Sequence, residues 1–298
     1  MPMGGFDGQH WDGRPVLPVG RHVWLPRRGR TFVRQLDGPP GAPVVVLLHG
    51  WTATADLNWF ACYEPLAEHF GVVALDHRGH GRGIRSLSPF RLEDCADDVA
   101  ALADELGLTN LIVAGYSMGG PIAQLLWRRH RRLVDGLVLC ATGCSFGGSA
   151  RERLLAGVAT GTGVLAGALP LERMTSATLA TWHQWRCRRG RPWWGYDDIA
   201  RHGWSQIVAA GRALLRFDSR PWIGDVDVPV AVVVTTADDV VPTRRQLAMV
   251  GALADVTRYD VDGGHAVCSS APERFVPSLV QACLDVAART QAGITVAA

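Results

Sequence analysis

Short apolar runs alternate along this chain with longer segments in which apolar residues recur at helical spacing. Five runs are apolar at nearly every position, as expected for strands buried on both faces of a sheet: residues 44–48, 72–75, 111–114, 137–139 and 231–234. Residues 92–106, 244–253 and 273–288 have the helical spacing, and Gly107 follows the first of them as a stop signal. This alternation predicts a mostly parallel sheet with helices on both faces.

Two further β-type runs, residues 22–25 and 31–35, precede the first central strand. Arg27-Arg28-Gly29 joins them, and a glycine between two such runs is typical of a tight reversal. We therefore expect an antiparallel hairpin at one edge of the sheet.

The alternation of strands and helices breaks down between about Ser145 and Asp225. This stretch contains Ala- and Leu-rich helical segments and six of the eleven tryptophans of the chain. The simplest interpretation is a helical cap insertion over residues 145–225, within an α/β core that consists of residues 1–144 and 226–298.

Composition narrows the classes of function. The chain has 298 residues, of which 48% are hydrophobic and 19% charged, which is ordinary for a globular protein. Its net charge of +2 is too small to favour nucleic acid as a partner. The N-terminal residues lack the features of a secretory signal, and every apolar run is shorter than the roughly 18–20 residues of a spanning helix. We expect a cytoplasmic protein without a transmembrane segment, and the oligomeric state stays open.

The seven cysteines form an odd set without C-x-x-C pairs, so we expect free core thiols in a reducing compartment. A zinc site built from Cys140 and Cys144 is the less favoured alternative. We expect neither a metal nor a cofactor.

The segment Gly115-Tyr116-Ser117-Met118-Gly119 places one serine in a Gly-x-Ser-x-Gly frame. It follows the apolar residues 111–113 and precedes helix-compatible residues 121–127. A strand that reverses sharply into a helix forces the intervening side chain outward, where backbone N–H groups can receive negative charge. Ser117 is therefore a candidate nucleophile, and a Gly-rich turn with a buried serine is the alternative.

A serine nucleophile needs a histidine base oriented by a carboxylate, and in a parallel sheet both should follow strand ends. His265 follows the strand-like run 256–259 through two glycines, and it is the candidate base. Asp238 and Asp239 follow the run 231–234. We favour Asp238 as the orienting acid and interpret Asp239 as the cap of a helix near Thr243 or as a solvated charge.

The oxyanion of an acyl-transfer intermediate needs two N–H donors. Leu48-His49-Gly50-Trp51 follows the first central strand, and Gly50 allows the backbone to turn inward. The backbone N–H groups of Trp51 and Met118 are the candidate donors. We expect the ring of His49 to brace this loop rather than to take part in chemistry.

Together these motifs resemble the α/β-hydrolase superfamily, from about residue 20 to the C-terminus. The motifs that carry the resemblance are Gly115–Gly120, Leu48–Trp51, Asp76–Gly81, Asp238–Pro242 and Gly263–His265. It implies the chain order Ser, Asp, His, and an aspartate four residues before the proline, which supports Asp238. It also implies that Asp76 belongs to a structural loop at the pocket rim. The single Gly-x oxyanion element is similar to that of lipases and esterases that accept an extended acyl chain.

The sequence predicts a serine hydrolase that cleaves a small-molecule carboxylic ester through a Ser–His–Asp acyl-enzyme mechanism. Trp182, Trp185 and Trp204 are candidate substrate-binding residues for an apolar or aromatic acyl group, because indole rings make large rigid walls. The alternative is that these tryptophans only pack the cap helices onto the core.

Several other functions remain possible on the same fold. A thioesterase, an acyltransferase or a perhydrolase-like activity would use the same three side chains, and a lyase, a cyclase or a non-catalytic binding module is less favoured. Epoxide hydrolases and dehalogenases need a carboxylate at the position of Ser117 and are excluded. The basic stretch 186–191 is expected to be solvated, with contact to an anionic acyl carrier as the alternative.

Overall fold

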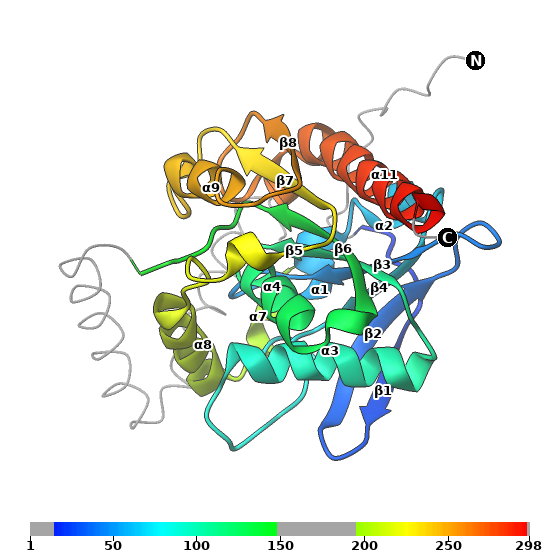
Figure 1. Ribbon diagram of the computed structural model, residues 1–298. Coiled ribbons are helices and arrows are strands. Elements are labelled where there is room, and N and C mark those ends of the chain that lie inside the picture. The colour runs from blue at the N-terminus through cyan, green and yellow to red at the C-terminus, as the bar shows by residue number, and fades with distance from the viewer. Residues whose placement is uncertain (1–14, 148–194, 297–298) are drawn as a thin grey trace.

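An eight-stranded sheet forms the centre of the computed structural model, which describes residues 15–147 and 195–296 (Figure 1). The strand order is β1-β2-β4-β3-β5-β6-β7-β8, and only the pairs β1/β2 and β2/β4 are antiparallel. The strands are β1 (Gly20–Leu25), β2 (Gly29–Leu36), β3 (Val44–Leu48), β4 (Gly71–Leu75), β5 (Leu111–Tyr116), β6 (Val134–Cys140), β7 (Val230–Thr235) and β8 (Val256–Val261).

Helices flank this sheet on both sides (Figure 1). The described α-helices are α1 (Ala55–Trp59), α2 (Tyr63–Ala67), α3 (Leu92–Leu106), α4 (Gly119–Arg129), α7 (Tyr196–Ala200), α8 (Trp204–Arg216), α9 (Thr243–Val250), α10 (Val267–Ser270) and α11 (Pro272–Val296). Two short 3-10 helices, η1 (Arg131–Leu133) and η2 (Ile223–Asp225), precede β6 and β7.

Side chains that alternate along each strand build two separate cores, because successive residues of a strand point to opposite faces. In β3, Val46 and Leu48 belong to the core beneath α3, α4, α8 and α9, whereas Val45 and Leu47 belong to the core beneath α1, α2 and α11. Both faces are apolar, which explains why the central strands are continuous apolar runs. The carboxyl ends of the parallel strands are thereby fixed relative to one another.

The predicted architecture is confirmed. Each of the five central strands expected from the sequence lies within a strand of the sheet, and the expected hairpin forms the edge pair β1/β2. Helix α3 has the predicted bounds and ends at Gly107, whose φ of +64° is the left-handed conformation that glycine adopts easily. The fold is therefore a mostly parallel α/β sheet of the kind that the resemblance implied.

Two helix ends differ from the sequence prediction. Helix α9 ends at Val250 rather than near residue 253, because the N–H groups of Ala252 and Leu253 bond to carbonyls three residues back. Such bonds tighten the last turn and release the chain toward β8. Helix α11 continues beyond the predicted residue 288, to Val296.

The predicted cap stretch is described only in part. Helices α7 and α8 and the 3-10 helix η2 lie between β6 and β7, and Ser145 and Asp218 form an isolated antiparallel bridge. Residues 148–194 lie outside the described residues, so the bounds of the cap stay a prediction. The basic stretch 186–191 lies there too.

The described cysteines are all free and buried: Cys62, Cys95, Cys140, Cys144, Cys268 and Cys283. In residues 15–147 and 195–296, no group of three or more acidic, His or Cys side chains could hold a metal ion. Over the same residues, no helix has both the length and the apolar character that crossing a bilayer requires.

Candidate active site

The turn between β5 and α4 holds Ser117 in an unusual backbone conformation. Strand β5 ends at Tyr116, helix α4 begins at Gly119, and Ser117 between them has a φ of +51°. Non-glycine residues seldom adopt this left-handed region, and it costs about 1–3 kcal/mol unless the surroundings enforce it. Here the N–H of Ser117 donates to the Cys140 carbonyl (2.9 Å), and the Thr142 hydroxyl donates to the Ser117 carbonyl (2.8 Å).

Three glycines allow this turn to be as tight as it is. A Cβ on Gly115 would lie 2.3 Å from the Gly119 carbonyl oxygen, and a Cβ on Gly119 would lie 2.1 Å from the Leu48 carbonyl oxygen. A Cβ on Gly120 would lie 2.3 Å from the hydroxyl of Thr142. No larger residue fits these positions without movement of backbone or packed side chains, so the sequence pattern has a direct steric cause.

The structure brings Ser117, His265 and Asp238 together, from three separate strand ends. The Oγ atom of Ser117 is 2.9 Å from His265 Nε2, and His265 Nδ1 is 2.8 Å from Asp238 Oδ2. A carboxylate can only accept hydrogen bonds, so Nδ1 carries the proton and Nε2 is the acceptor for the serine hydroxyl. His265 follows β8, as predicted.

The Asp238 carboxylate is buried and saturated with donors. Its Oδ1 accepts from the N–H groups of Val240 (2.9 Å) and Val241 (2.8 Å), and its Oδ2 accepts from the Thr235 hydroxyl (2.7 Å) as well as from His265. Burial alone would raise the pKa of Asp238, but the hydrogen bonds and the neighbouring imidazole outweigh it and hold the pKa below its usual value. The carboxylate therefore stays ionised beside the imidazole.

Asp239 has a different environment. It is exposed, and the N-cap residue of α9 is Pro242, which makes no side-chain capping bond. Of the two interpretations that the sequence allowed, the solvated charge fits this position and the helix cap does not. The pair Asp238 and Asp239 thus contains one buried carboxylate that contacts His265 and one that faces solvent.

The sequence did not predict the side chains that support this arrangement. Gln246 on α9 is fully buried, and its amide donates to the Thr235 hydroxyl (2.7 Å) and to Asp238 (3.1 Å). The hydroxyl of Tyr116 donates to the backbone carbonyl of His265 (2.6 Å) and fixes the loop after β8. An uncharged polar residue within an otherwise amphipathic helix, as at Gln246, is the only sequence signal for such a partner.

The loop after β3 runs directly past the nucleophile. A Cβ on Gly50 would lie 3.3 Å from the Ser117 Cβ, and the N–H of Gly50 donates to the Asn58 side chain (2.7 Å). No described residue accepts a hydrogen bond from the N–H of Trp51 or of Met118. An oxyanion at Ser117 would require two such N–H donors, and these two stay the candidates.

His49 braces this loop, as predicted. Its Nε2 accepts from the N–H of His77 (2.9 Å), so its Nδ1 carries the proton that is donated to the Gly50 carbonyl (2.8 Å). Burial lowers the pKa of His49 to about 3 and keeps the ring neutral, which both bonds require. The loops after β3 and β4 are joined through this ring.

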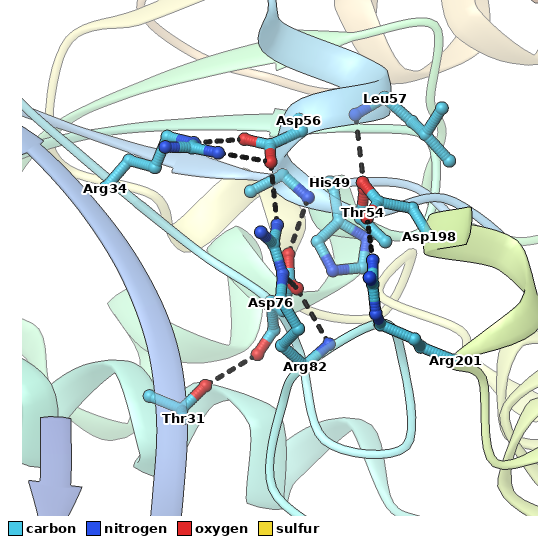
Figure 2. Close-up of polar contacts among 12 residues, drawn as sticks. Thr31, Arg34, His49, Thr54, Asp56, Leu57, Asp76, Arg82, Asp198 and Arg201 are labelled. Atoms are coloured by element: carbon cyan, nitrogen blue, oxygen red, sulfur yellow. Dashed lines mark hydrogen bonds and ion pairs between the residues drawn. The ribbon is translucent and has the colours of Figure 1, made fainter. Parts of the chain in front are cut away.

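Asp76, which follows β4, is a structural residue in a buried ionic cluster (Figure 2). It accepts from the N–H of Ala55 (2.9 Å) and from the N–H and Nε of Arg82 (2.9 and 3.1 Å). Arg82 also reaches Asp56 (2.7 Å), and Asp56 is paired with Arg34 (2.7 Å). The cluster fixes the loops on this side of Ser117, in line with what the resemblance implied for Asp76.

Only one of the three candidate substrate-binding tryptophans lies within the described residues. Trp182 and Trp185 lie outside the described residues. Trp204 is the first residue of α8, and its ring centroid is 5.9 Å from that of His202. No described contact joins Trp204 to Ser117, so its role in substrate binding stays a prediction.

The arrangement of Ser117, His265 and Asp238 can move a proton from the serine oxygen to a neutral imidazole whose other nitrogen is anchored. Ser117 is 7% exposed, so its surroundings exclude most of the bulk solvent. Adjacent N–H donors can receive a developing oxyanion. The geometry suits attack of the serine oxygen on a carbonyl carbon.

The chain is similar to proteins of a known family. Residues 43–272 match the family model described as the alpha/beta hydrolase fold. Among curated proteins, the chain is 30% identical over 254 residues to the RutD protein of Agrobacterium fabrum (strain C58), which is provisionally named a carbamate hydrolase. The match covers 80% of this chain and 92% of that protein.

Solved structures show the same fold. An esterase from Exiguobacterium antarcticum superimposes with a TM-score of 0.72 at 18% identity, and the match covers 88% of this chain and 98% of the esterase. An enol-lactonase from Burkholderia xenovorans LB400 gives a TM-score of 0.68 at 23% identity, over 89% of this chain and 100% of the lactonase.

The steric role of Gly115 generates a stability prediction. Gly115→Ala should lower the free energy of unfolding by about 2 kcal/mol or more, because the new methyl group overlaps the Gly119 carbonyl oxygen. Urea unfolding measures this difference. Gly251→Ala is the matched control: the φ of Gly251 is −69°, an added Cβ would lie 3.7 Å from the Leu247 carbonyl oxygen, and we expect a change within about 0.5 kcal/mol. Equal effects at the two glycines would contradict the steric account.

The neutral state of His49 generates a prediction about pH. The unfolded chain takes up a proton on this ring below pH 6.5, whereas the folded chain does so only near pH 3. Acidification from pH 7.5 to 5.0 should therefore cost about 2 kcal/mol of stability through this residue. Urea unfolding at the two pH values should give a smaller loss for His49→Gln than for the wild type. An unchanged loss would show that the folded ring is already protonated at pH 5.0.

Proposed function

Because this chain belongs to the alpha/beta hydrolase family, we propose that it is a serine hydrolase that cleaves carboxylic esters through an acyl-enzyme on Ser117. The single observation that carries this proposal is the continuous hydrogen-bond chain from Ser117 Oγ through His265 to Asp238, with separations of 2.9 and 2.8 Å. A serine hydroxyl becomes a useful nucleophile at neutral pH only when such a base accepts its proton.

The first half-reaction forms the acyl-enzyme. Ser117 Oγ attacks the ester carbonyl carbon while its proton moves to His265 Nε2, and Asp238 stabilises the imidazolium that results. The backbone N–H groups of Trp51 and Met118 bind the oxyanion of the tetrahedral intermediate. Collapse of this intermediate breaks the bond to the alkoxy group, which leaves as the alcohol with the proton from His265.

The second half-reaction restores the enzyme. His265, neutral again, accepts a proton from a water molecule as the water oxygen attacks the acyl carbon. The same two N–H donors receive the second oxyanion. The acid then leaves as the bond to Ser117 Oγ breaks and the proton on His265 returns to the serine oxygen. This cycle uses only side chains and backbone groups of the chain itself.

We propose an apolar or aromatic acyl group for the substrate. The sequence places six tryptophans between residues 145 and 225, and Trp51, whose backbone N–H is a candidate oxyanion donor, is 40% exposed. Indole rings bury a large area when they contact an apolar or aromatic group, so they stabilise its binding. The names of the structurally similar esterase and enol-lactonase agree with a carboxylic ester as the bond cleaved.

A carbamate is the second candidate substrate class, and the RutD relative is the observation that favours it. A carbamate carbonyl can be attacked by the same serine, and the oxyanion would use the same donors. The leaving group and the acyl portion differ, so the two classes separate in a direct assay.

A panel of p-nitrophenyl esters of increasing acyl length, together with p-nitrophenyl N,N-dimethylcarbamate, tests this function. We expect ester turnover to rise with acyl length, and Ser117→Ala to lower kcat by at least about 10³-fold. A carbamate that releases p-nitrophenol faster than every ester would move the assignment to the second class. Negligible rates across the whole panel would contradict both.

The choice of acid is tested by a matched pair of variants. Asp238→Asn should lower kcat about 10²–10⁴-fold, because an amide can donate to Nδ1 and favours the wrong imidazole tautomer. Asp239→Asn changes an exposed neighbour in the same loop and should retain wild-type kcat. Steady-state kinetics on the best ester decides between them. Wild-type activity in Asp238→Asn would refute the assignment of Asp238.

A further inference from the structure

The loop from Trp51 to Thr54 joins β3 to α1 and carries the proposed oxyanion donor, the N–H of Trp51. Three of its four residues make polar contacts with one distant segment, Asp198–Ile207, which spans the end of α7 and the start of α8. About 150 positions of sequence separate the partners. Through these contacts, the segment can fix the position of the Trp51 N–H.

The first contact is made by the Trp51 side chain. Its indole Nε1–H donates to the carbonyl of Ile207 in the first turn of α8, at 2.8 Å. A Cβ added to Gly211, one turn further along α8, would lie only 2.8 Å from the indole ring. Gly211 therefore lets the ring pack directly on the helix backbone. The side chain of the residue that offers the oxyanion donor is thus held by α8.

The second contact is made by His202, between α7 and α8. Its Nδ1 accepts from the N–H of Gly81 (2.8 Å), so its Nε2 carries the proton that is donated to the Thr52 carbonyl (3.1 Å). Thr52 has a φ of +59°, and a β-branched residue keeps this left-handed conformation only when outside contacts enforce it. His202 supplies one of those contacts, directly next to Trp51.

The third contact joins Thr54 to α7 (Figure 2). The Thr54 hydroxyl donates to Asp198 (3.0 Å) while it accepts from the N–H of Leu57 (3.2 Å) as the N-cap of α1. Arg201 holds the other carboxylate oxygen of Asp198 (2.9 Å). The far end of the loop is therefore tied to α7, as its near end is tied to α8.

We infer that the segment Asp198–Ile207, together with Gly211, is a positioning element for the oxyanion hole, and that the Trp51 indole and His202 are its positioning residues. This inference rests on the proposed function. The segment contributes no reacting group. It holds the backbone of residues 51–52 so that the Trp51 N–H points at the oxyanion, and displacement of α7 and α8 weakens transition-state binding more than substrate binding.

Two conservative variants test the inference. Trp51→Phe keeps the backbone N–H and an aromatic ring on Gly211 but loses the bond to Ile207. His202→Gln removes the ring that bridges Gly81 and Thr52. Because complete loss of one oxyanion donor costs about 10²–10³-fold in kcat, we expect partial misplacement to lower kcat about 10-fold or more in each variant with KM within about 2-fold.

The matched controls are Trp24→Phe on the edge strand β1 and His69→Gln, two exposed residues remote from the loop. Both should keep wild-type kcat. Inhibition gives a second readout that a merely structural role would not move. A trifluoromethyl ketone, which binds as a tetrahedral oxyanion, should lose affinity in parallel with kcat/KM, while the affinity of the corresponding methyl ketone stays constant.

Hydrogen exchange of the peptide that covers residues 50–54 measures local opening of the loop in the absence of substrate. We expect its exchange to rise about 10-fold in both variants and to stay unchanged in both controls. An active wild type whose two variants keep full kcat would overturn this inference alone, whatever their exchange rates. A wild type inactive on every ester and carbamate would overturn the proposed function, and the catalytic role of the segment with it.

Discussion

The left-handed backbone of Ser117 is the constraint on which the rest of the candidate site depends. At a φ of +51°, the side chain leaves the β5–α4 turn toward His265, and its oxygen lies 2.9 Å from His265 Nε2. The conformation is costly for serine, and it persists because backbone atoms of β3 and α4 pack where Cβ atoms would lie on Gly115 and Gly119. The packing of β3, β5 and α4 in the sheet therefore keeps Ser117 in this strained conformation.

A buried cluster of charged side chains fixes the loops on the other side of the site. Burial alone would raise the pKa of Asp56, yet the hydrogen bonds and charges of Arg34 and Arg82 lower it below its usual value. Asp76 shares Arg82 and holds the N–H at the start of α1 (Figure 2). A buried pair of this kind adds little net stability, but removal of one partner leaves an uncompensated charge. The cluster instead holds the loops that flank Ser117 in a single arrangement.

The sequence was sufficient for the features that depend on local pattern. Strands covered on both faces are continuous apolar runs, so the sheet could be predicted, and Ser117 was a candidate because it follows such a run directly. His265 follows the partly exposed edge strand β8 through two glycines, so its candidacy came from its place after a strand end. The contacts of Gln246 and His202 could not be predicted. Gln246 bonds to Asp238 only eight residues away, but this bond depends on how α9 packs against the end of β7, and His202 bonds to a loop 150 residues away in the chain. The predicted end of α9 was wrong. Its last turn tightens because N–H groups bond to carbonyls three residues back, and the periodicity of the apolar residues does not reveal such bonds.

The central claim is that Ser117 is a nucleophile activated by His265, and covalent trapping tests it most directly. Incubation with a fluorophosphonate followed by intact-mass and peptide mass spectrometry should reveal one phosphonyl group per chain, on the peptide that contains Ser117. His265→Ala should slow this labelling at least about 10²-fold, because the serine then lacks its base. Labelling of another residue, or wild-type labelling rates without His265, would contradict the account.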